Sequence, residues 1–304
     1  MAHTFFRIVT LAAAFAAAAS AQEISATLAS QSGDFARPLD ATPDPDGSAI
    51  YFTAIGPNGP GVFRVAAVGG PVTAIATGAP FVDPAGISIS NDGRFLYVAD
   101  SHAWAGRGRL GQIFVLPVSG GAVQTLHGAE GRAPRGLEVT SDDNVFFTGI
   151  DPATRRRGVY RVPVAGADAA SVVFEGAPLV APDGIAVSRN GTVYFTERGG
   201  ASASVCKIER GAVSTVVEFI RAGDPAGIAL SLDESALLVS TLQPYRNRAQ
   251  VLLVDLATLE PRASTNGIGQ NPSAGGLHRA RNAAVFAWAD TLGGGTGGVY
   301  RVVR

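Results

Sequence analysis

The sequence predicts an all-β protein, a six-bladed β-propeller built of four-stranded blades. A proline-led unit recurs six times along the chain, with 43 to 50 residues between successive prolines. Each unit carries four short strand patterns rich in Val, Ile and aromatic residues, which is typical of a propeller blade. Almost no segment has a sustained apolar period of 3.6 residues, so helices should be nearly absent. The units begin near Pro38, Pro84, Pro134, Pro182, Pro225 and Pro272.

The first residues after the N-terminal leader complete the last blade. The sixth unit stops at "GVYRVVR", which is only its third strand, whereas residues 23–30, "EISATLAS", resemble the fourth-strand pattern "PVTAIATG" of the first unit. We expect residues 23–30 to pair with the strand that ends at Val303, because a closed ring leaves no open sheet edge. Residues 22–304 are therefore predicted to form a single domain.

Residues 1–21 have the pattern of a signal peptide. A weakly basic start precedes the apolar run "IVTLAAAFAAAAS", and Ala19 and Ala21 are small residues placed for cleavage after Ala21. The run is too short and too poor in large side chains for a transmembrane helix. We therefore expect a secreted or periplasmic monomer without a membrane anchor, and Cys206, the sole cysteine, excludes an intrachain disulfide. A net charge of −1 gives no reason to expect binding to nucleic acid.

One face of the propeller is predicted to be functional. The Pro-x-Gly turn leads into the innermost strand, and the loops between the second and third strands return to that same face. These loops are the long and irregular parts of the units, such as "DSHAWAGRGRLG" and "GIDPATRRRG". Variation concentrated on one face of a rigid scaffold marks a candidate binding surface.

Arg135 and Asp183, the residues between Pro and Gly in two successive units, should point toward the channel mouth. One interpretation is structural: Asp183 accepts a backbone N–H in its own turn and pairs with Arg135. The other is that both residues act on a substrate, together with His102, the one histidine placed on this face for acid–base chemistry. His278 is assigned to a turn on the far face.

Acidic and aromatic residues near this face give further candidates. Asp100, Glu197 and Asp290 end the second strands of alternate blades, where they are either metal ligands or solvated loop acids. Trp104 and Tyr245, in two of the long loops, are candidate contacts to a substrate or partner. The run of residues 155–157, three arginines, is interpreted as a solvated loop tip.

Common catalytic motifs are missing from the sequence. It contains no Gly-x-Ser-x-Gly, His-Glu-x-x-His or Cys-x-x-Cys pattern. The segment "GRGRLG" has the spacing of a dinucleotide-binding loop, but it opens a strand rather than a helix, so no helix N-terminus is available for a pyrophosphate.

The repeated pattern P-x-G-I-A-V-S-x-x-G-x-V-Y-F-T resembles the six-bladed propellers of the regucalcin and gluconolactonase group, which extends to paraoxonases and strictosidine-synthase-like proteins. The resemblance implies a hydrolase of lactones or related esters, with a divalent metal, usually Ca²⁺, at the channel mouth. Asp183 matches the metal ligand of the group's Pro-Asp-Gly turn, and Asp40 is the nearest acid to its first-blade Glu. Asp100 and Asp290 are the further candidate ligands, and Arg135 stands in the place of the group's Asn. The alternative is a propeller that binds a small molecule or a protein without catalysis.

Overall fold

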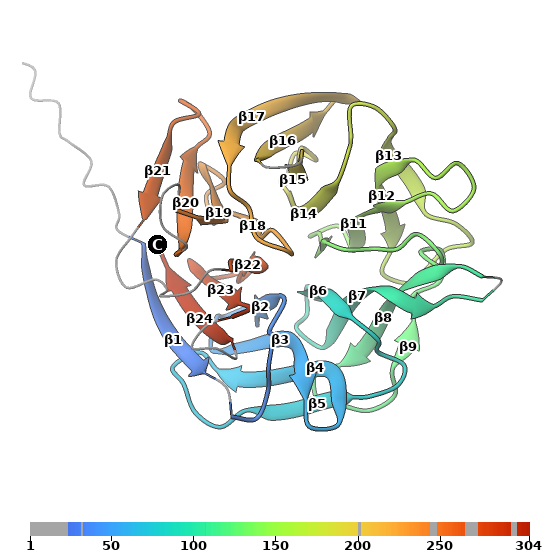
Figure 1. Ribbon diagram of the computed structural model, residues 1–304, viewed down its shortest axis with the longest axis vertical. Helices are drawn as coiled ribbons and strands as arrows, with labels where there is room; N and C mark the ends of the chain where they lie inside the picture. Colours follow the sequence, from blue (N-terminus) through green and yellow to red (C-terminus); the bar gives the residue numbers. More distant parts are fainter. Residues whose placement is uncertain are drawn as a thin grey trace, which may run out of the picture.

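The computed structural model describes residues 24–31, 33–106, 108–199, 202–243, 248–264, 273–292 and 297–304. Within them the chain forms six separate four-stranded antiparallel sheets, arranged as blades around a central axis (Figure 1). The predicted six-bladed β-propeller is confirmed. No helix in this part of the chain could cross a membrane. The predicted signal peptide, residues 1–21, lies outside the described residues.

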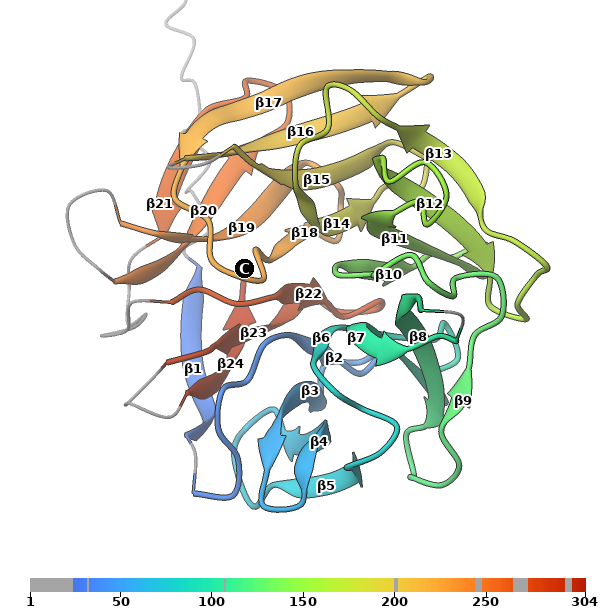
Figure 2. The same cartoon turned by 45° about the vertical axis from the view of Figure 1, so that its right-hand side comes forward.

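Each blade runs from a short inner strand to a strand at the rim, and the turned view shows the blades as twisted sheets (Figure 2). Blade one contains β2 (Ala41–Pro43), β3 (Ala49–Gly56), β4 (Gly59–Ala66) and β5 (Thr73–Thr77). Blade two contains β6 (Pro84–Ile89), β7 (Phe95–Trp104), β8 (Leu110–Pro117) and β9 (Gln124–Thr125). Blade three contains β10 (Leu137–Val139), β11 (Asn144–Ile150), β12 (Arg157–Pro163) and β13 (Ser171–Glu175).

The second half of the ring repeats this order. Blade four contains β14 (Pro182–Val187), β15 (Val193–Arg198), β16 (Ala203–Glu209) and β17 (Ala212–Ile220). Blade five contains β18 (Ile228–Leu230), β19 (Ala236–Leu242), β20 (Ala249–Asp255) and β21 (Pro261–Ser264). Blade six contains β22 (Leu277–Arg279), β23 (Val285–Asp290), β24 (Gly298–Val303) and, at its rim, β1 (Ser25–Gln31).

Strand β1 closes the ring as predicted. It pairs antiparallel with β24, from Ser25 opposite Val303 to Gln31 opposite Gly298. Just before β1, the Ile24 side chain is buried in a cluster that includes Trp288. The first and last strands of the domain therefore share one blade and one hydrophobic core.

The core lies between neighbouring blades, because both faces of each inner sheet are covered. The second strand of a blade supplies the largest buried rings, and these include Phe52, Phe147 and Phe195. Phe147 and Tyr160 pack ring against ring within blade three, 5.6 Å between centroids. These aromatic side chains thus stabilise the contact between blades.

A side-chain hydroxyl near the end of the second strand ties one blade to the next. Thr148 Oγ1 accepts a hydrogen bond from Gly136 N within blade three and donates to the carbonyl of Asp183 in blade four, at 2.7 Å. Thr196 and Ser240 make the same pair of contacts in blades four and five. One hydroxyl therefore satisfies an inner-strand N–H and a carbonyl of the neighbouring blade at once.

The glycine of the Pro-x-Gly turn is required by this close approach. A Cβ added at Gly136 would lie 2.3 Å from Asp183 O, and one added at Gly184 would lie 1.8 Å from Ala226 O. Both distances are far below van der Waals contact with a backbone atom that cannot move independently. Glycine thus allows the inner strands of neighbouring blades to touch through their backbones.

Shortening the side chain that anchors the closing strand should weaken the whole domain. We expect Ile24→Ala to lower the free energy of unfolding by about 2 to 4 kcal/mol, because it leaves a cavity against Trp288 and Tyr300. Leu28→Ala, on β1 itself but 42% exposed, is the matched control and should cost less than about 1 kcal/mol. Denaturant unfolding measures both variants. Equally small losses of unfolding free energy would mean that the anchoring of the closing strand contributes little to stability.

Candidate functional site

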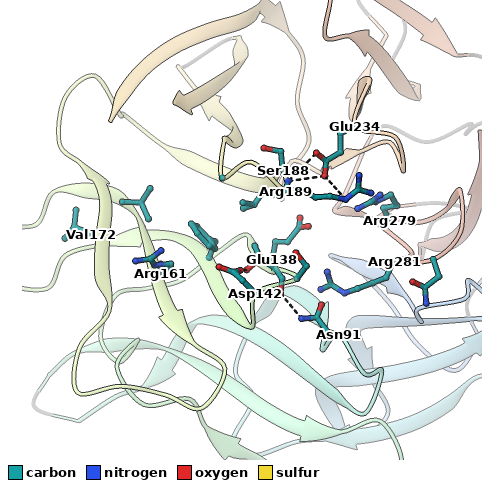
Figure 3. Close-up of a pocket in the computed structure, with 17 residues that line it drawn as sticks. Asn91, Glu138, Asp142, Arg161, Val172, Ser188, Arg189, Glu234, Arg279 and Arg281 are labelled. Carbon is teal, nitrogen blue, oxygen red and sulfur yellow. Dashed lines mark hydrogen bonds and ion pairs between the residues drawn. The ribbon is translucent and has the colours of Figure 1, made fainter. Parts of the chain in front are cut away.

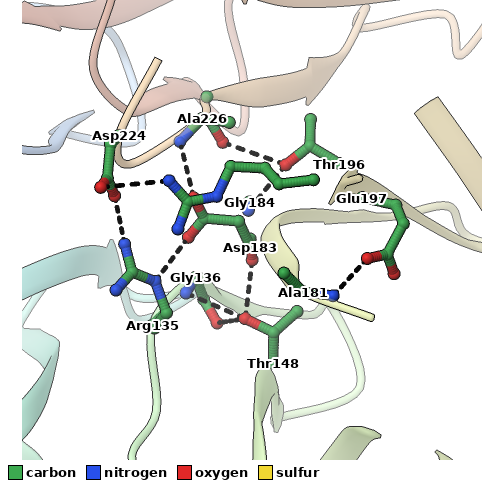
Figure 4. A network of polar contacts seen from close by, with 12 residues as sticks. Arg135, Gly136, Thr148, Ala181, Asp183, Gly184, Thr196, Glu197, Asp224 and Ala226 are labelled. Carbon is green, nitrogen blue, oxygen red and sulfur yellow. Dashed lines mark hydrogen bonds and ion pairs between the residues drawn. The ribbon is translucent and has the colours of Figure 1, made fainter. Parts of the chain in front are cut away.

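Asp183 occupies the channel mouth as a fully buried carboxylate at the start of β14. Its Oδ1 accepts a hydrogen bond from Arg135 Nε at 2.9 Å, and its Oδ2 accepts one from Ala226 N at 3.1 Å (Figure 4). A second guanidinium, that of Arg198, lies 3.5 Å from Oδ2. Asp183 therefore pairs with Arg135. The backbone N–H that donates a hydrogen bond to it belongs to the next blade, not to the turn of Asp183 itself.

Asp224 completes a ring of four charges with these residues. Its carboxylate contacts Arg135 Nη2 on one side and Arg198 Nη1, at 3.1 Å, on the other. Burial alone would raise the pKa of Asp224, but the two guanidinium groups lower it below its usual value. Burial would likewise lower the pKa of Arg135, and the carboxylates of Asp183 and Asp224 raise it. Two acids and two arginines leave the mouth without net charge, and neither Arg198 nor Asp224 was predicted from the sequence.

Asp40 is a buried link among three blades. Its Oδ2 accepts a hydrogen bond from Ile87 N in blade two at 2.9 Å and lies 3.0 Å from His278 Nε2 in blade six. Its Oδ1 accepts from the N–H of Ala41. His278 lies in strand β22, not in the turn to which the sequence assigned it. Burial lowers the pKa of His278, and the nearby Asp40 more than offsets this, so that its pKa is raised.

The acids at the ends of the second strands hold backbone groups. Asp100 is fully buried, and its Oδ2 accepts hydrogen bonds from Val82 N at 2.7 Å and Asp83 N at 3.0 Å, in the segment that leads into its own blade. Glu197 makes the equivalent contacts in blade four. Asp290 is also fully buried, and its Oδ1 accepts from the N–H of Leu292. The alternative of solvated loop acids does not describe Asp100 or Asp290.

The carboxylates considered for calcium do not fit a shared ion. Asp183, Asp40 and Asp100 each have both oxygens engaged by N–H groups or cationic side chains. Within the described ranges, no three His, Cys, Asp or Glu side chains gather closely enough to hold a metal. A hard cation needs several open oxygen ligands, and two arginines beside Asp183 repel it. Calcium binding stays a prediction.

A pocket of about 680 Å³ opens beside the mouth on the face predicted to be functional. Its walls come from the β7–β8 loop of blade two and the β11–β12 loop of blade three, with Arg135 and Pro182 on the side of the mouth. None of the described residues that line it is acidic. Its charged or titratable lining consists of His102, Arg109, Arg135, Arg155 and Arg157.

Three arginines of the pocket are available to a ligand. Arg109, Arg155 and Arg157 are exposed, and in the described part of the chain no ion pair joins them to an acid. Arg155 has a left-handed backbone, with φ of 62°, in the short turn before β12. The interpretation of this run as a loop tip missed that Arg155 and Arg157 face a pocket. The three consecutive arginines in one loop were the feature of the sequence that could have indicated an anion-binding site.

His102 is held against a carboxylate at the edge of the pocket. Its Nδ1 lies 3.1 Å from Asp83 Oδ2 and 3.1 Å from Ser101 Oγ. A carboxylate at Nδ1 leaves Nε2 to exchange a proton. Asp83 precedes the second Pro-x-Gly turn and was not among the predicted residues.

The structure thus brings together only part of the predicted set. His102 and Arg135 line one pocket, and Asp183 lies behind Arg135. Trp104 is 64% exposed and is not among the residues that line the pocket. Tyr245 falls outside the described residues.

No protein-family model and no curated protein sequence matches the chain. Similar solved structures include an aldose sugar dehydrogenase of Streptomyces coelicolor in its PQQ-bound form, with 13% identity and a TM-score of 0.66 over 92% of this chain and 98% of that one. A protein named as a candidate gluconolactonase has 13% identity and a TM-score of 0.61 over 92% of each chain. A catalytically inactive virginiamycin B lyase from Staphylococcus aureus, with quinupristin, has 13% identity and a TM-score of 0.56 over 93% and 100%. These likenesses support the six-bladed fold and no more.

Removing the charge of Asp183 should destabilise the domain. In Asp183→Asn, Arg135 and Arg198 lose the buried one of the two carboxylates that balance their charges. We therefore expect the free energy of unfolding to fall by about 2 to 4 kcal/mol. Asp224→Asn alters the same two arginines at a site whose side chain is 63% exposed, and it should cost less than about 1 kcal/mol. Chemical denaturation compares the two variants. A small effect of Asp183→Asn would show that its charge is not structural.

Proposed function

We propose that the protein is an exported, monomeric propeller that binds a small organic anion, such as a sugar acid, in the arginine-lined pocket beside the channel mouth. The observation that supports this most is the pocket's charge: four arginines and His102 line it, and no described lining residue is acidic. Guanidinium groups form paired hydrogen bonds with carboxylate and phosphate oxygens.

The pocket also has the size of a small-molecule site. Its volume of about 680 Å³ lies inside the usual range for ligand pockets, roughly 300 to 1,000 Å³. Two similar structures are named for sugar-related activities, an aldose sugar dehydrogenase and a candidate gluconolactonase. Carried over to this chain, those names favour a polyhydroxy acid as the anion.

Gluconate binding, measured by calorimetry at low salt, tests the proposal. We expect the double variant Arg155→Gln, Arg157→Gln to weaken binding by about tenfold or more, because two charge-assisted contacts are lost. Added KCl should weaken binding to the unmodified protein as well. Arg64→Gln, an exposed arginine on β4 outside the pocket, is the control and should bind as the unmodified protein does. Equal affinity in the double variant and the control would refute this site.

Hydrolysis of a lactone or related ester is a second candidate function, favoured by one observation. The His102–Asp83 pair has the arrangement of a general base with an orienting carboxylate, and His102 lines the pocket. In this reaction His102 Nε2 takes a proton from water as the water oxygen bonds to the carbonyl carbon. Arg135 stabilises the developing oxyanion. The C–O bond to the ring oxygen then breaks, and the proton passes to the leaving alkoxide, which gives a hydroxy acid.

Turnover of a panel of sugar lactones tests the second candidate. We expect His102→Ala to lower the hydrolysis rate by about 10²-fold or more, the usual contribution of a general base. His127→Ala is the matched control, because His127 is also 3.1 Å from a carboxylate but lies outside this pocket. The chemistry uses groups of this chain alone, so EDTA should leave the rate unchanged. Activity that needs calcium, or that survives His102→Ala, would contradict this mechanism.

A further inference from the structure

A second cavity, of about 670 Å³, opens at the opposite end of the propeller from the arginine-lined pocket. It is lined by the hairpins that join the first and second strands of several blades and by the inner strands beneath them (Figure 3). Its lining shares no residue with the pocket beside the mouth. Any ligand here therefore binds independently of the proposed function.

Two of the acids in the cavity wall are already engaged. Both carboxylate oxygens of Glu234 accept from Arg189 N, and the Arg189 guanidinium lies 3.6 Å away. Asp142 accepts hydrogen bonds from Thr140 and Asn144. Glu234 is therefore paired with a cation, whereas the donors to Asp142 are neutral and leave its charge in the cavity wall.

Glu138 is different, because it lies on the inner strand β10 and its carboxyl makes no hydrogen bond within the described part of the chain. Figure 3 shows its side chain between the hairpins, with Arg281 and Arg279 beyond it. Burial raises the pKa of Glu138, although His278, Arg281 and Arg279 partly offset the shift. Glu138 is half-buried, so its unpartnered carboxyl remains open to a ligand that enters the cavity.

Arg279 and Arg281, which also line this cavity, have guanidinium N–H groups without a hydrogen-bond partner in the described part of the chain. Arg281 Nη2 is fixed by the carbonyls of Ile89 and Val139, while its buried Nε has no partner among the described atoms. Arg279 makes one long contact, 3.3 Å, from Nη1 to Ser231 O. Burial lowers the pKa of both arginines. The four arginines and three acids that line the cavity carry a formal net charge of +1.

We propose that this cavity is a second ligand site, for a small α-hydroxy or α-amino acid with an apolar side chain. The carboxylate of the ligand binds Arg279 and Arg281, and its hydroxyl or ammonium group donates to Glu138. Phe146 and Val187, which also line the cavity, contact the apolar side chain. The volume is within the range of small-molecule sites.

Three compounds that differ at one atom position test the site: 3-phenyllactate, phenylalanine and 3-phenylpropionate. By calorimetry on the full domain we expect phenyllactate or phenylalanine to bind more tightly than phenylpropionate, which lacks the α donor. Glu138→Gln should reduce that preference, and Arg279→Gln should weaken binding of the preferred compound by about tenfold or more. Arg64→Gln, an exposed arginine on β4 that lines neither pocket, is the control and should change neither result.

Thermal melting establishes that each variant is folded. Where Arg279→Gln does not fold, Arg279→Lys keeps the charge but not the two-pronged donor, and it should still weaken binding. No binding of any of the three compounds at about 10 mM, or equal affinity in the Arg279 variant and Arg64→Gln, would overturn the proposal. Which α substituent is preferred distinguishes a hydroxy acid from an amino acid.

Discussion

The ring depends on hydrogen bonds that cross from one blade to the next at the innermost strands. Thr148 and Ser240 each hold a carbonyl of the following blade, and the glycines opposite them let the two backbones approach. Blades two and six have Ala99 and Ala289 at the equivalent positions. Alanine has no hydroxyl, so other side chains make the contacts to the neighbouring blades there. Around blade one the substitute is Asp40, whose carboxylate contacts Ile87 in blade two and His278 in blade six. Between blades two and three it is Ser88, which accepts from Val139 N.

This constraint also decides where binding chemistry is possible. The acids nearest the axis at the mouth hold strands, lead-in segments and arginines together, and the charges of Asp183 and Asp224 are balanced by Arg135 and Arg198. Free charge lies farther from those acids. Arg155 lies in the β11–β12 loop and Arg157 begins β12, while on the other face Arg279 ends β22 and Arg281 lies in the hairpin after it. A buried acid near the axis is therefore poor evidence for catalysis in this ring. An arginine without an acidic partner is the stronger indication of a site.

The sequence predicted the fold because the repeats have a local physical origin. The alternating apolar strands recur in each blade, the turn glycine and the terminal hydroxyl recur in most of them, and β1 was recognisable as the missing strand from its similarity to β5. The pairing of Arg135 with Asp183 could also be predicted from the sequence, since each is the middle residue of the Pro-x-Gly turn in its blade and the two blades are neighbours.

The rest of the site depends on contacts that no repeat reveals. Arg198 meets Asp183 within blade four, and Asp224 contacts Arg135 and Arg198 from the segment that leads into blade five. Asp83 meets His102 across two strands of blade two. Glu138 is on a strand of only three residues, so its position gave no sign that it faces a cavity. Such groups become visible only when the ring is closed and their distances are known.

Closure by β1 imposes an order on the making of this protein. Ser25 is among the first residues of the domain to be synthesised, and its partner Val303 is the penultimate residue of the chain. Strand β1 must therefore wait without a partner until β24 has been made, about 270 residues later. Bringing together segments so distant in sequence carries a large loop-closure entropy and is slow. Chains that lack β24 will thus expose β1 as an unpaired strand, a form more prone to edge-to-edge association than the closed ring.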